Sequence, residues 1–180
     1  MIEAFVGLGS NLGDRLGNLG AAVDRLAREP GFVLRRVSLA YESEPVGPPQ
    51  PHYLNAVAQV GTLLSARATL SRLHGIEEAL GRVRREKWGS REIDLDLLLF
   101  GDSVIEETGL QVPHPLLAQR AFVLEPLCEV APDFWHPLLR MTVDELRHRL
   151  PAGERGQARA FRPLRRALLD TEPEKEPTRE

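Results

Sequence analysis

The segment 93–100 reads IDLDLLLF, so two acidic side chains, Asp94 and Asp96, begin an otherwise apolar run. A continuous apolar run of this length is typical of a strand that passes through a hydrophobic core. Successive side chains of a strand point to opposite faces, so the two carboxylates share one face, with α-carbons roughly 6.5 Å apart. Two carboxylates at the start of a buried strand repel each other and resist desolvation, so they need positive partners.

A basic segment comes directly before this strand. Residues 82–91 hold one acid, Glu86, and a Trp-Gly pair at Trp88, together with five bases: Arg82, Arg84, Arg85, Lys87 and Arg91. Arginine side chains bind phosphate oxygens through paired hydrogen bonds, and a basic loop can close over a polyphosphate. A solvated charge run is the alternative interpretation of the segment. Trp88 is predicted either to cover a flat ring or to pack against the sheet.

The two carboxylates and the basic segment together predict a magnesium-dependent polyphosphate site. Carboxylate oxygens select Mg²⁺, which is commonly shared with substrate phosphates. Two such ions, about 4 Å apart, would contact both the attacking and the leaving oxygen of a phosphoryl transfer. In the alternative interpretation, Asp94 and Asp96 only form ion pairs with nearby arginines. The first interpretation makes the chain a small enzyme that transfers phosphate groups.

The remaining periodicity predicts an α+β fold. The expected strands are 2–8, 32–41, 53–63 and 93–100, and the expected helices are 14–26 and 66–80, with Asp14 and Ser65 as N-caps. A glycine-rich turn is expected at 7–13 and a proline-rich loop at 42–52. The order strand, helix, strand, strand, helix, strand is that of a ferredoxin-like βαββαβ core with a mainly antiparallel sheet.

Further helices are expected in the C-terminal part. Short helical pieces are expected near 116–131, and Thr142 and Glu145 form a capping-box pattern that starts another helix. The segment 155–166 holds five arginines and is either a packed amphipathic element or a solvated one. We therefore expect a single domain over 1–168, followed by a polar tail at 169–180.

Composition excludes several classes of protein. The net charge of −3 argues against a general nucleic-acid binder. No apolar run has the length of a membrane helix, and the start of the chain lacks the pattern of a signal peptide. The single cysteine, Cys128, lies in an apolar run and is predicted to be a buried structural thiol. A reducing cytoplasm is the expected location.

The basic segment and the strand after it resemble a known family. Residues 81–101, GRVRREKWGSREIDLDLLLFG, closely resemble the signature of the 6-hydroxymethyl-7,8-dihydropterin pyrophosphokinases. Other motifs follow in the family's order: GLGSNLGD at 7–14, YLNA at 53–56, VPHP at 112–115 and RAFVL at 120–124. The resemblance extends to about residue 150. It implies transfer of pyrophosphate from ATP to the hydroxymethyl oxygen of the pterin, with release of AMP, in folate biosynthesis.

The resemblance also implies roles for individual residues. The magnesium ligands would be Asp94 and Asp96, with two ions expected, and these two residues with Arg82 and Arg91 would form the catalytic set. ATP, the co-substrate, would contact His74, Glu77, Arg82, Arg84, Lys87, Trp88, Arg91, Gln111, His114 and Arg120. The pterin would contact Ser43, Val46, Tyr53, Asn55, Trp88 and Phe122. The expected partners are these small molecules alone, with no nucleic acid and no membrane, and the expected state is a monomer.

These roles agree with the chemistry of the ligands. A pterin is flat, with donors and acceptors along one edge, which suits the Asn55 amide and aromatic rings. Tyr53 and Asn55 are two residues apart and so share one strand face. For Tyr53 ordinary core packing is the alternative, and for His114 a structural hydrogen bond.

The chain departs from the family pattern at three points. The basic segment is one residue shorter than in the best-known members. Gly109 stands where an arginine is often found, so one ATP contact is missing or replaced. Glu44 precedes Pro45 at a position where a less charged residue is common. These differences bear on loop closure and nucleotide affinity, and none of them involves the carboxylate pair.

Other functions fit the sequence less well. A dinucleotide-binding turn would place its third glycine one position earlier than Gly13. Polymerase-like nucleotidyltransferases carry Gly-Ser and Asp-x-Asp close together, whereas Ser10 and Asp94 are far apart in this sequence. A ferredoxin-like RNA-binding module needs exposed aromatic and basic residues on its central strands, and this chain is 6% aromatic with acids in that place.

Overall fold

The computed structural model describes residues 1–45, 49–82, 91–154 and 157–164. Within these ranges the order of elements is β1 (Ile2–Ser10), α1 (Arg15–Arg28), β2 (Phe32–Val37), β3 (Ala40–Ser43), β4 (Tyr53–Thr62), α2 (Ala66–Ala79), β5 (Asp94–Phe100), β6 (Ile105–Glu107), β7 (Leu110–Val112), a 3-10 helix (Leu117–Gln119), α3 (Ala121–Val130), β8 (Trp135–His136), β9 (Met141–Thr142), α4 (Val143–Arg149) and β10 (Ala158–Arg162).

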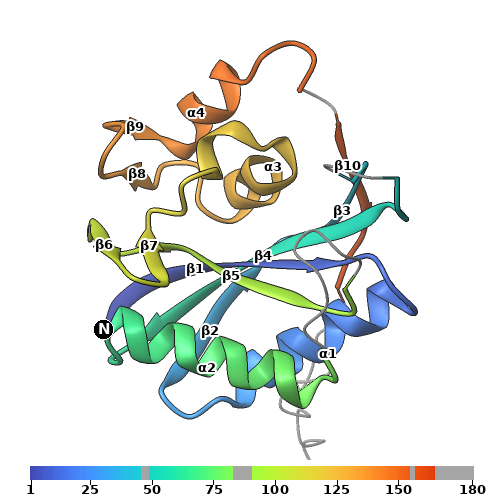
Figure 1. Cartoon of the computed structure of the whole chain (residues 1–180). Coiled ribbons are helices and arrows are strands. Elements are labelled where there is room, and N and C mark those ends of the chain that lie inside the picture. Colours follow the sequence, from blue (N-terminus) through green and yellow to red (C-terminus); the bar gives the residue numbers. More distant parts are fainter. Residues whose placement is uncertain (46–48, 83–90, 155–156, 165–180) are drawn as a thin grey trace, which may run out of the picture.

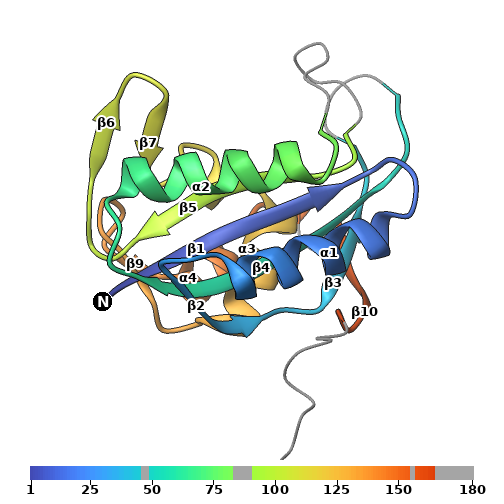
Figure 2. The same ribbon diagram turned by 90° about the horizontal axis from the view of Figure 1, so that it is seen from below.

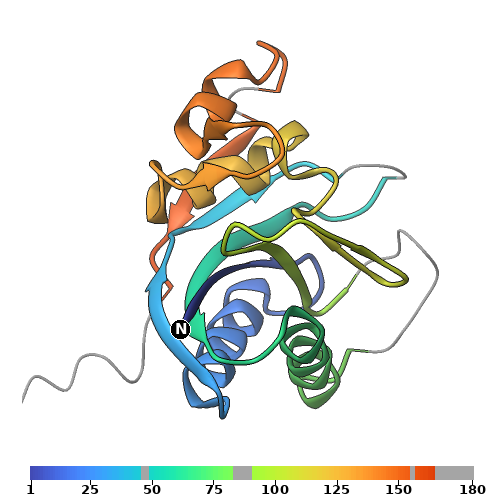
Figure 3. The same ribbon diagram turned by 90° about the vertical axis from the view of Figure 1, so that its left-hand side faces the viewer.

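One antiparallel sheet forms the middle layer. Its strands lie in the order β10-β3-β4-β1-β5, and β2 also pairs with β4. Helices α1 and α2 cover one face, and α3 and α4 lie over the other (Figure 1). Seen from below, α1 and α2 lie side by side across the strands (Figure 2). The end view shows the three layers one above another (Figure 3). The expected mixture of helices with an antiparallel sheet is confirmed.

Side chains of the strands point alternately to the two faces of the sheet, and each face carries its own hydrophobic core. The core under the sheet contains Leu19 and Leu26 of α1, and the core above it contains Leu124 and Leu127 of α3. Strand β5 contributes to both because its pairing with β1 shifts register: Val6 lies opposite Leu97, and Phe5 opposite Leu99. This bulge lets Leu98 and Leu99 both join the upper core, while Leu95, Leu97 and Phe100 join the lower one.

The predicted helix starts are confirmed. The Asp14 side chain accepts a hydrogen bond from Gly17 N–H, and Ser65 Oγ accepts one from Ala68 N–H. Thr142 and Glu145 form both bonds of a capping box at the start of α4. Each cap satisfies backbone donors that the first helical turn leaves without an internal partner.

The prediction of one strand over 32–41 is wrong, because regular strand structure is interrupted at Ser38 and Leu39. Ser38 Oγ accepts a hydrogen bond from Val57 N–H at 2.9 Å. The Leu39 N–H donates to both oxygens of Glu129, a residue of α3, at 3.0 and 3.1 Å. These side chains take the place of strand partners, so the backbone turns between β2 and β3.

Two further expectations need correction. The first strand does not end at Leu8 but runs to Ser10, so Gly7 and Gly9 belong to the strand and not to a turn. Cys128 is partly exposed rather than buried. Its Sγ donates to Asp144 Oδ1 at 3.4 Å, and burial, together with that carboxylate, raises the pKa of the thiol to about 11.

The chain adds an edge strand after α4. In β10, Ala158 lies opposite Ser43 of β3 and is buried, while residues 159–162 are exposed. The part of 155–166 that the structure describes is therefore mainly a solvated edge strand. The predicted tail at 169–180 lies outside the described residues. No helix among the described residues is both long and apolar enough to cross a bilayer.

Candidate active site

The register of the sheet brings the candidate residues into rows on its upper face. Tyr41 of β3 lies opposite Asn55 of β4, which lies opposite Gly9 of β1, and Gly9 lies opposite Asp94 of β5. A second row joins Val57, Gly7 and Asp96 in the same way. Each carboxylate is thus separated from a β4 side chain by one glycine of the central strand.

The two glycines leave an open trough across the sheet. A Cβ atom at Gly9 would lie 3.4 Å from Asn55 Oδ1, and one at Gly7 would lie 3.3 Å from the Leu98 side chain. Any larger side chain at either position would fill the space between the carboxylates and β4. Strand β1 therefore contributes open space and uncovered backbone to the site, whereas β4 and β5 on either side of it contribute functional side chains.

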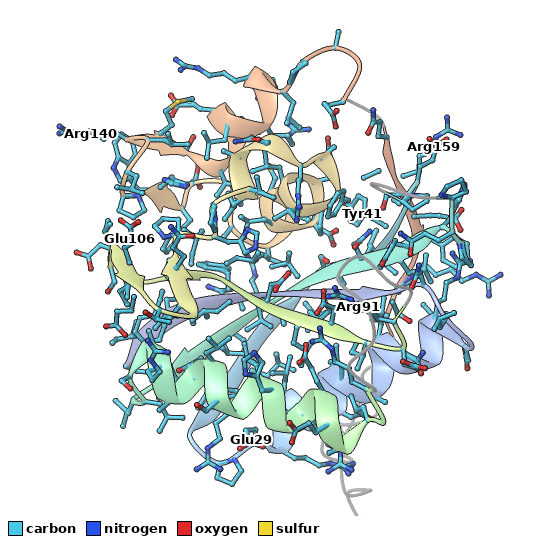
Figure 4. The ribbon with its side chains drawn as sticks, viewed as in Figure 1. Glu29, Tyr41, Arg91, Glu106, Arg140 and Arg159 are labelled. Carbon is cyan, nitrogen blue, oxygen red and sulfur yellow. The ribbon has the colours of Figure 1, made fainter. Side chains whose placement is uncertain are left out.

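A cavity of about 250 Å³ stands over this trough. Its lining combines the glycines and apolar side chains with polar groups from distant segments, namely Gly7, Leu8, Gly9, Ser43, Glu44, Gln50, Tyr53, Asn55, Ala56, Val57, Arg91, Asp94, Asp96, Leu98, His114, Arg120, Phe122 and Val123. Strands β1, β3, β4 and β5 supply one side and α3 with the segment before it supplies the other. In Figure 4, Tyr41 lies between β3 and α3, and Arg91 lies near the start of β5.

At one end of the cavity Asn55 is held in a fixed orientation. Its Nδ2 donates to Ser43 Oγ at 2.8 Å, and both side chains are buried. The amide oxygen therefore faces the space over Gly9. The guanidinium of Arg120 lies 5.5 Å from the centre of the Phe122 ring, which adds a fixed aromatic face to this end. Burial raises the pKa of Tyr53, so its hydroxyl stays protonated at neutral pH.

The carboxylate end carries several opposite charges. Arg82 Nη1 lies 2.8 Å from Asp94 Oδ1, and Arg91 Nη1 lies 2.7 Å from Asp94 Oδ2. Asp96 is more deeply placed, and burial and the charge of Asp94 raise its pKa. Asp94 therefore forms the ion pairs that the alternative interpretation predicts, and its oxygens are also of the kind that Mg²⁺ binds.

His114 lies beside Asp96 and has structural bonds as well. Its backbone N–H donates to Leu98 O at 2.8 Å, and its Nδ1 accepts a hydrogen bond from Leu116 N–H at 3.2 Å. Burial lowers the pKa of the imidazole, so the ring is neutral at pH 7. Since Nδ1 is an acceptor, the neutral ring carries its proton on Nε2, which is the nitrogen free to donate to a ligand.

A second, more open space of about 570 Å³ adjoins the first. It is bordered by α2 and by the β6–β7 hairpin, and its lining includes His74, Glu106, Glu107, Gly109 and Gln111. Asp96 and His114 line both spaces. The hairpin is tied to α2 because Arg67 donates to Thr108 O and pairs with Glu107.

The structure thus brings most predicted site residues to two adjoining spaces. Val46, Arg84, Lys87 and Trp88 lie outside the described residues. Glu77 and Arg82 line neither space and instead contact each other.

Sequence reasoning missed other residues that line the first cavity. Gly7, Gly9, Gln50, Val57 and Leu98 are among them. Their place follows from the strand register, and only the glycine motif at 7–13 could have indicated it.

The carboxylate pair has the donor set that Mg²⁺ uses when phosphates complete its coordination. Asp94 and Asp96 lie on one strand face, and Asp96 also lines the open space. Among the described residues, no cluster of three or more His, Cys, Asp or Glu side chains could hold a metal ion. A hard cation bound here would take its remaining oxygens from substrate or water, and the pair therefore fits Mg²⁺ bound together with a polyphosphate.

Comparisons with known proteins agree with this chemistry. A sequence profile of the 7,8-dihydro-6-hydroxymethylpterin-pyrophosphokinase (HPPK) family matches residues 5–132. A 2-amino-4-hydroxy-6-hydroxymethyldihydropteridine pyrophosphokinase of Synechocystis sp. is 44% identical over 143 residues, covering 79% of this chain and 73% of the relative. The enzyme of the same name from Aquifex aeolicus is 38% identical over 148 residues, covering 82% of this chain and 91% of the relative.

Solved structures share the fold. A Plasmodium falciparum HPPK-DHPS crystal structure with pteroate superposes with a TM-score of 0.67 at 15% identity, covering 82% of this chain and 44% of that chain. The wild-type structure of the same protein gives 0.65 at 15% identity, with the same coverage. This chain thus spans less than half of those structures, and the likeness concerns the fold alone. With the family profile and the relatives taken together, the chain belongs to the 7,8-dihydro-6-hydroxymethylpterin-pyrophosphokinase family.

Proposed function

We propose that the two adjoining spaces hold the two substrates of one reaction, the transfer of pyrophosphate from ATP to the hydroxymethyl group of 6-hydroxymethyl-7,8-dihydropterin. The products are the pterin diphosphate and AMP, and the reaction belongs to folate biosynthesis. One observation carries the assignment of the site: Asp96, which shares a strand face with Asp94, lies where a small cavity with an oriented amide meets an open polar groove.

The small cavity suits the pterin. The Asn55 oxygen, oriented by Ser43, would accept hydrogen bonds from the amino and ring N–H groups of a flat heterocycle. Tyr53 and Phe122 would contact its faces. The trough over Gly7 and Gly9 would let the hydroxymethyl arm extend toward the carboxylates. Val46 and Trp88 keep their predicted pterin roles as proposals.

The open groove suits ATP. His74, Gln111 and His114 would contact the nucleotide, and Arg82, Arg91 and Arg120 would neutralise the phosphates. Arg84, Lys87 and Trp88 are proposed as further nucleotide contacts on sequence grounds. Gly109 lines this groove in place of the arginine that is often found there, which supports a weaker hold on the nucleotide.

The carboxylates would hold Mg²⁺, and we propose two ions. Mg²⁺ bound by these carboxylates would supply positive charge that stabilises the transferred phosphates. The protein's own part is to hold Asp94 and Asp96 in place, to exclude water, and to place cationic side chains beside the transferred group. Removal of one well-placed donor of this kind typically costs about 3 kcal/mol in the transition state.

Further proposals concern the fold type, the domain bounds and the oligomeric state. The strand order β3-β4-β1-β5, with α1 and α2 on one face, supports a ferredoxin-like split βαβ arrangement. We propose one catalytic domain over 1–168 with a polar tail at 169–180, acting as a monomer on small molecules and not on nucleic acid. A cytoplasmic location stays a prediction from the sequence.

The direct test is to incubate the protein with ATP, Mg²⁺ and the hydroxymethyl-dihydropterin and then to separate the nucleotides and pterins. We expect AMP and pterin diphosphate in equal amounts. Formation of ADP, or nucleotide turnover that does not depend on the pterin, would refute the assignment.

The metal role has its own test. Asp96→Ala should lower turnover by about a hundredfold or more, because one of two magnesium ligands is lost. The matched control is Asp102→Ala, which removes the same charge from an exposed position after β5. Circular dichroism should show that both variants fold. Near-normal activity of a folded Asp96→Ala protein would contradict the role of Asp96 as a metal ligand.

A further inference from the structure

Glu77 is a buried acid at the end of α2. It occupies the last turn of α2, is 3% exposed, and lines neither the small cavity nor the open groove. A nucleotide contact, the role that the family resemblance implies, would require it to face the groove. Its contacts point instead to the carboxylate strand and to Arg82.

Glu77 joins α2 to the strand between the two carboxylates. Its Oε1 accepts a hydrogen bond from Leu95 N–H at 2.6 Å. Among the strands that the structure describes, β5 is at the edge of the sheet, and none of them pairs with it on the side away from β1, where this N–H points. Leu95 lies between Asp94 and Asp96, and the bond therefore fixes the helix relative to the carboxylate pair.

The cap at the end of α2 brings the backbone of Arg82 back into contact with Glu77. Gly81 has φ of +85°, and Arg82 N–H donates to Glu77 O at 3.0 Å, which is the long bond of a Schellman motif. The same oxygen that binds Leu95, Glu77 Oε1, also contacts Arg82 Nη1. Arg82 is thus held to Glu77 through both its backbone and its guanidinium.

Arg82 is shared between two acids. Its Nη1 contacts Glu77 on one side and lies 2.8 Å from Asp94 Oδ1 on the other, while Arg91 binds the second Asp94 oxygen. A divalent cation bound by Asp94 competes for these same oxygens. When it does, Glu77 is the acid that stays beside Arg82 among the residues that the structure describes.

We propose that Glu77 is a positioning residue that retains Arg82 beside the carboxylate pair while Asp94 exchanges an arginine for a cation. This inference rests on the proposed function, because it assumes that Mg²⁺ and the nucleotide bind at Asp94 and Asp96. Without the charge of Glu77, Arg82 binds Asp94 alone and opposes the cation. The cost then appears in binding of the metal–nucleotide pair and not in binding of the pterin.

The test is a double-mutant cycle between Glu77→Gln and Arg82→Ala. Glu77→Gln keeps an oxygen for Leu95 N–H and removes only the charge. Calorimetry measures binding of Mg²⁺ with α,β-methylene-ATP, in which the bond to be broken is replaced. We expect Glu77→Gln to weaken binding about tenfold when Arg82 is present and less than twofold when it is absent, since the ion pair between Glu77 and Arg82 is lost only in the first case.

Steady-state kinetics supply a second reading. Glu77→Gln should raise the KM for ATP and leave the KM for the pterin unchanged. Glu78→Gln is the matched control, because it removes the same charge from the next, exposed position of α2 and should change neither constant. If Glu77→Gln does not fold, Glu77→Asp replaces it, because the shorter side chain loses the contact with Arg82, and its effect on binding should again be larger when Arg82 is present.

Two results would overturn the proposal. An equal loss of binding with and without Arg82 would make Glu77 a direct nucleotide contact, and no loss in either background would remove its role. Failure of the proposed function is a separate outcome. The unsubstituted protein would then form no pterin diphosphate, while the binding cycle would still report whether Glu77 acts through Arg82.

Discussion

Gly9 is the residue on which the shape of the small cavity most depends. It lies between Asn55 and Asp94 in one row across the sheet. Its backbone angles allow any residue, so glycine is not required for conformation at this position. What it provides is space, because both neighbouring side chains face the same cavity.

This space can be tested with Gly9→Ala. The added methyl group would lie 3.4 Å from Asn55 Oδ1 and 3.8 Å from the Tyr53 ring, distances that the fold tolerates. We expect the KM for the pterin to rise about tenfold, since one misplaced methyl group in a fitted pocket typically costs 1–3 kcal/mol. The KM for ATP should stay unchanged, as should both constants in Gly153→Ala, where the methyl group meets no atom within 4 Å. An unaltered pterin KM would contradict the proposed position of the pterin.

The residue scale also shows what local sequence could predict. The shared face of Asp94 and Asp96 follows from the period of a strand, and the structure has it. The part of Gly9 in the cavity depends on its pairing with Asn55 and Asp94, which are 46 and 85 positions away. Register between distant strands is set by the whole core, so it could not be derived from a local pattern.

At the scale of elements, α1 contains a glycine that no packing requires. Gly20 lies in the middle of the helix, and a Cβ atom there would meet no atom within 4 Å. Gly20→Ala should therefore raise the free energy of unfolding by about 0.5–1 kcal/mol, because alanine loses less backbone entropy in a helix. Urea denaturation followed by circular dichroism would measure it.

Gly31 provides the contrast. It follows the end of α1 with φ of +92°, and its Cβ would lie 3.2 Å from Leu64. Gly31→Ala should lower the free energy of unfolding by about 1 kcal/mol or more. If both substitutions had the same sign, backbone conformation would not be the cause.

The helices were predicted well, because their caps and apolar stripes lie within each helix or directly beside it in the sequence. Asp14, Ser65 and Thr142 all cap the helices that they were expected to begin. The break between β2 and β3 was missed because Glu129, which binds Leu39 N–H, comes from α3, 90 residues later. The partial exposure of Cys128 was missed for a similar reason, since its partner Asp144 belongs to α4.

At the scale of the whole molecule, two cores share one sheet. Strands β1 and β4 contribute side chains to both, so neither core can lose its packing without disturbing the strands of the other. This arrangement supports one cooperative unit over the catalytic part of the chain.

Matched core substitutions would test this cooperativity. Leu26→Ala in the lower core and Leu124→Ala in the upper core each remove a fully buried side chain and should each cost about 2–5 kcal/mol. Both variants should unfold in one transition, seen alike by circular dichroism and tryptophan fluorescence. Leu138→Ala, at an exposed position, should change stability by less than about 0.5 kcal/mol. Two separate transitions in either core variant would show independent units.

Asp96 and His114 line both the small cavity and the open groove, and this has a thermodynamic consequence. A ligand that changes the charge or the proton of either group from one side alters the electrostatic potential on the other side. If the two substrates bind in these spaces as proposed, such coupling is reciprocal, and each substrate changes the affinity for the other by the same factor. A dissociation constant measured for one substrate alone therefore describes a different equilibrium from the one that operates when both substrates are present.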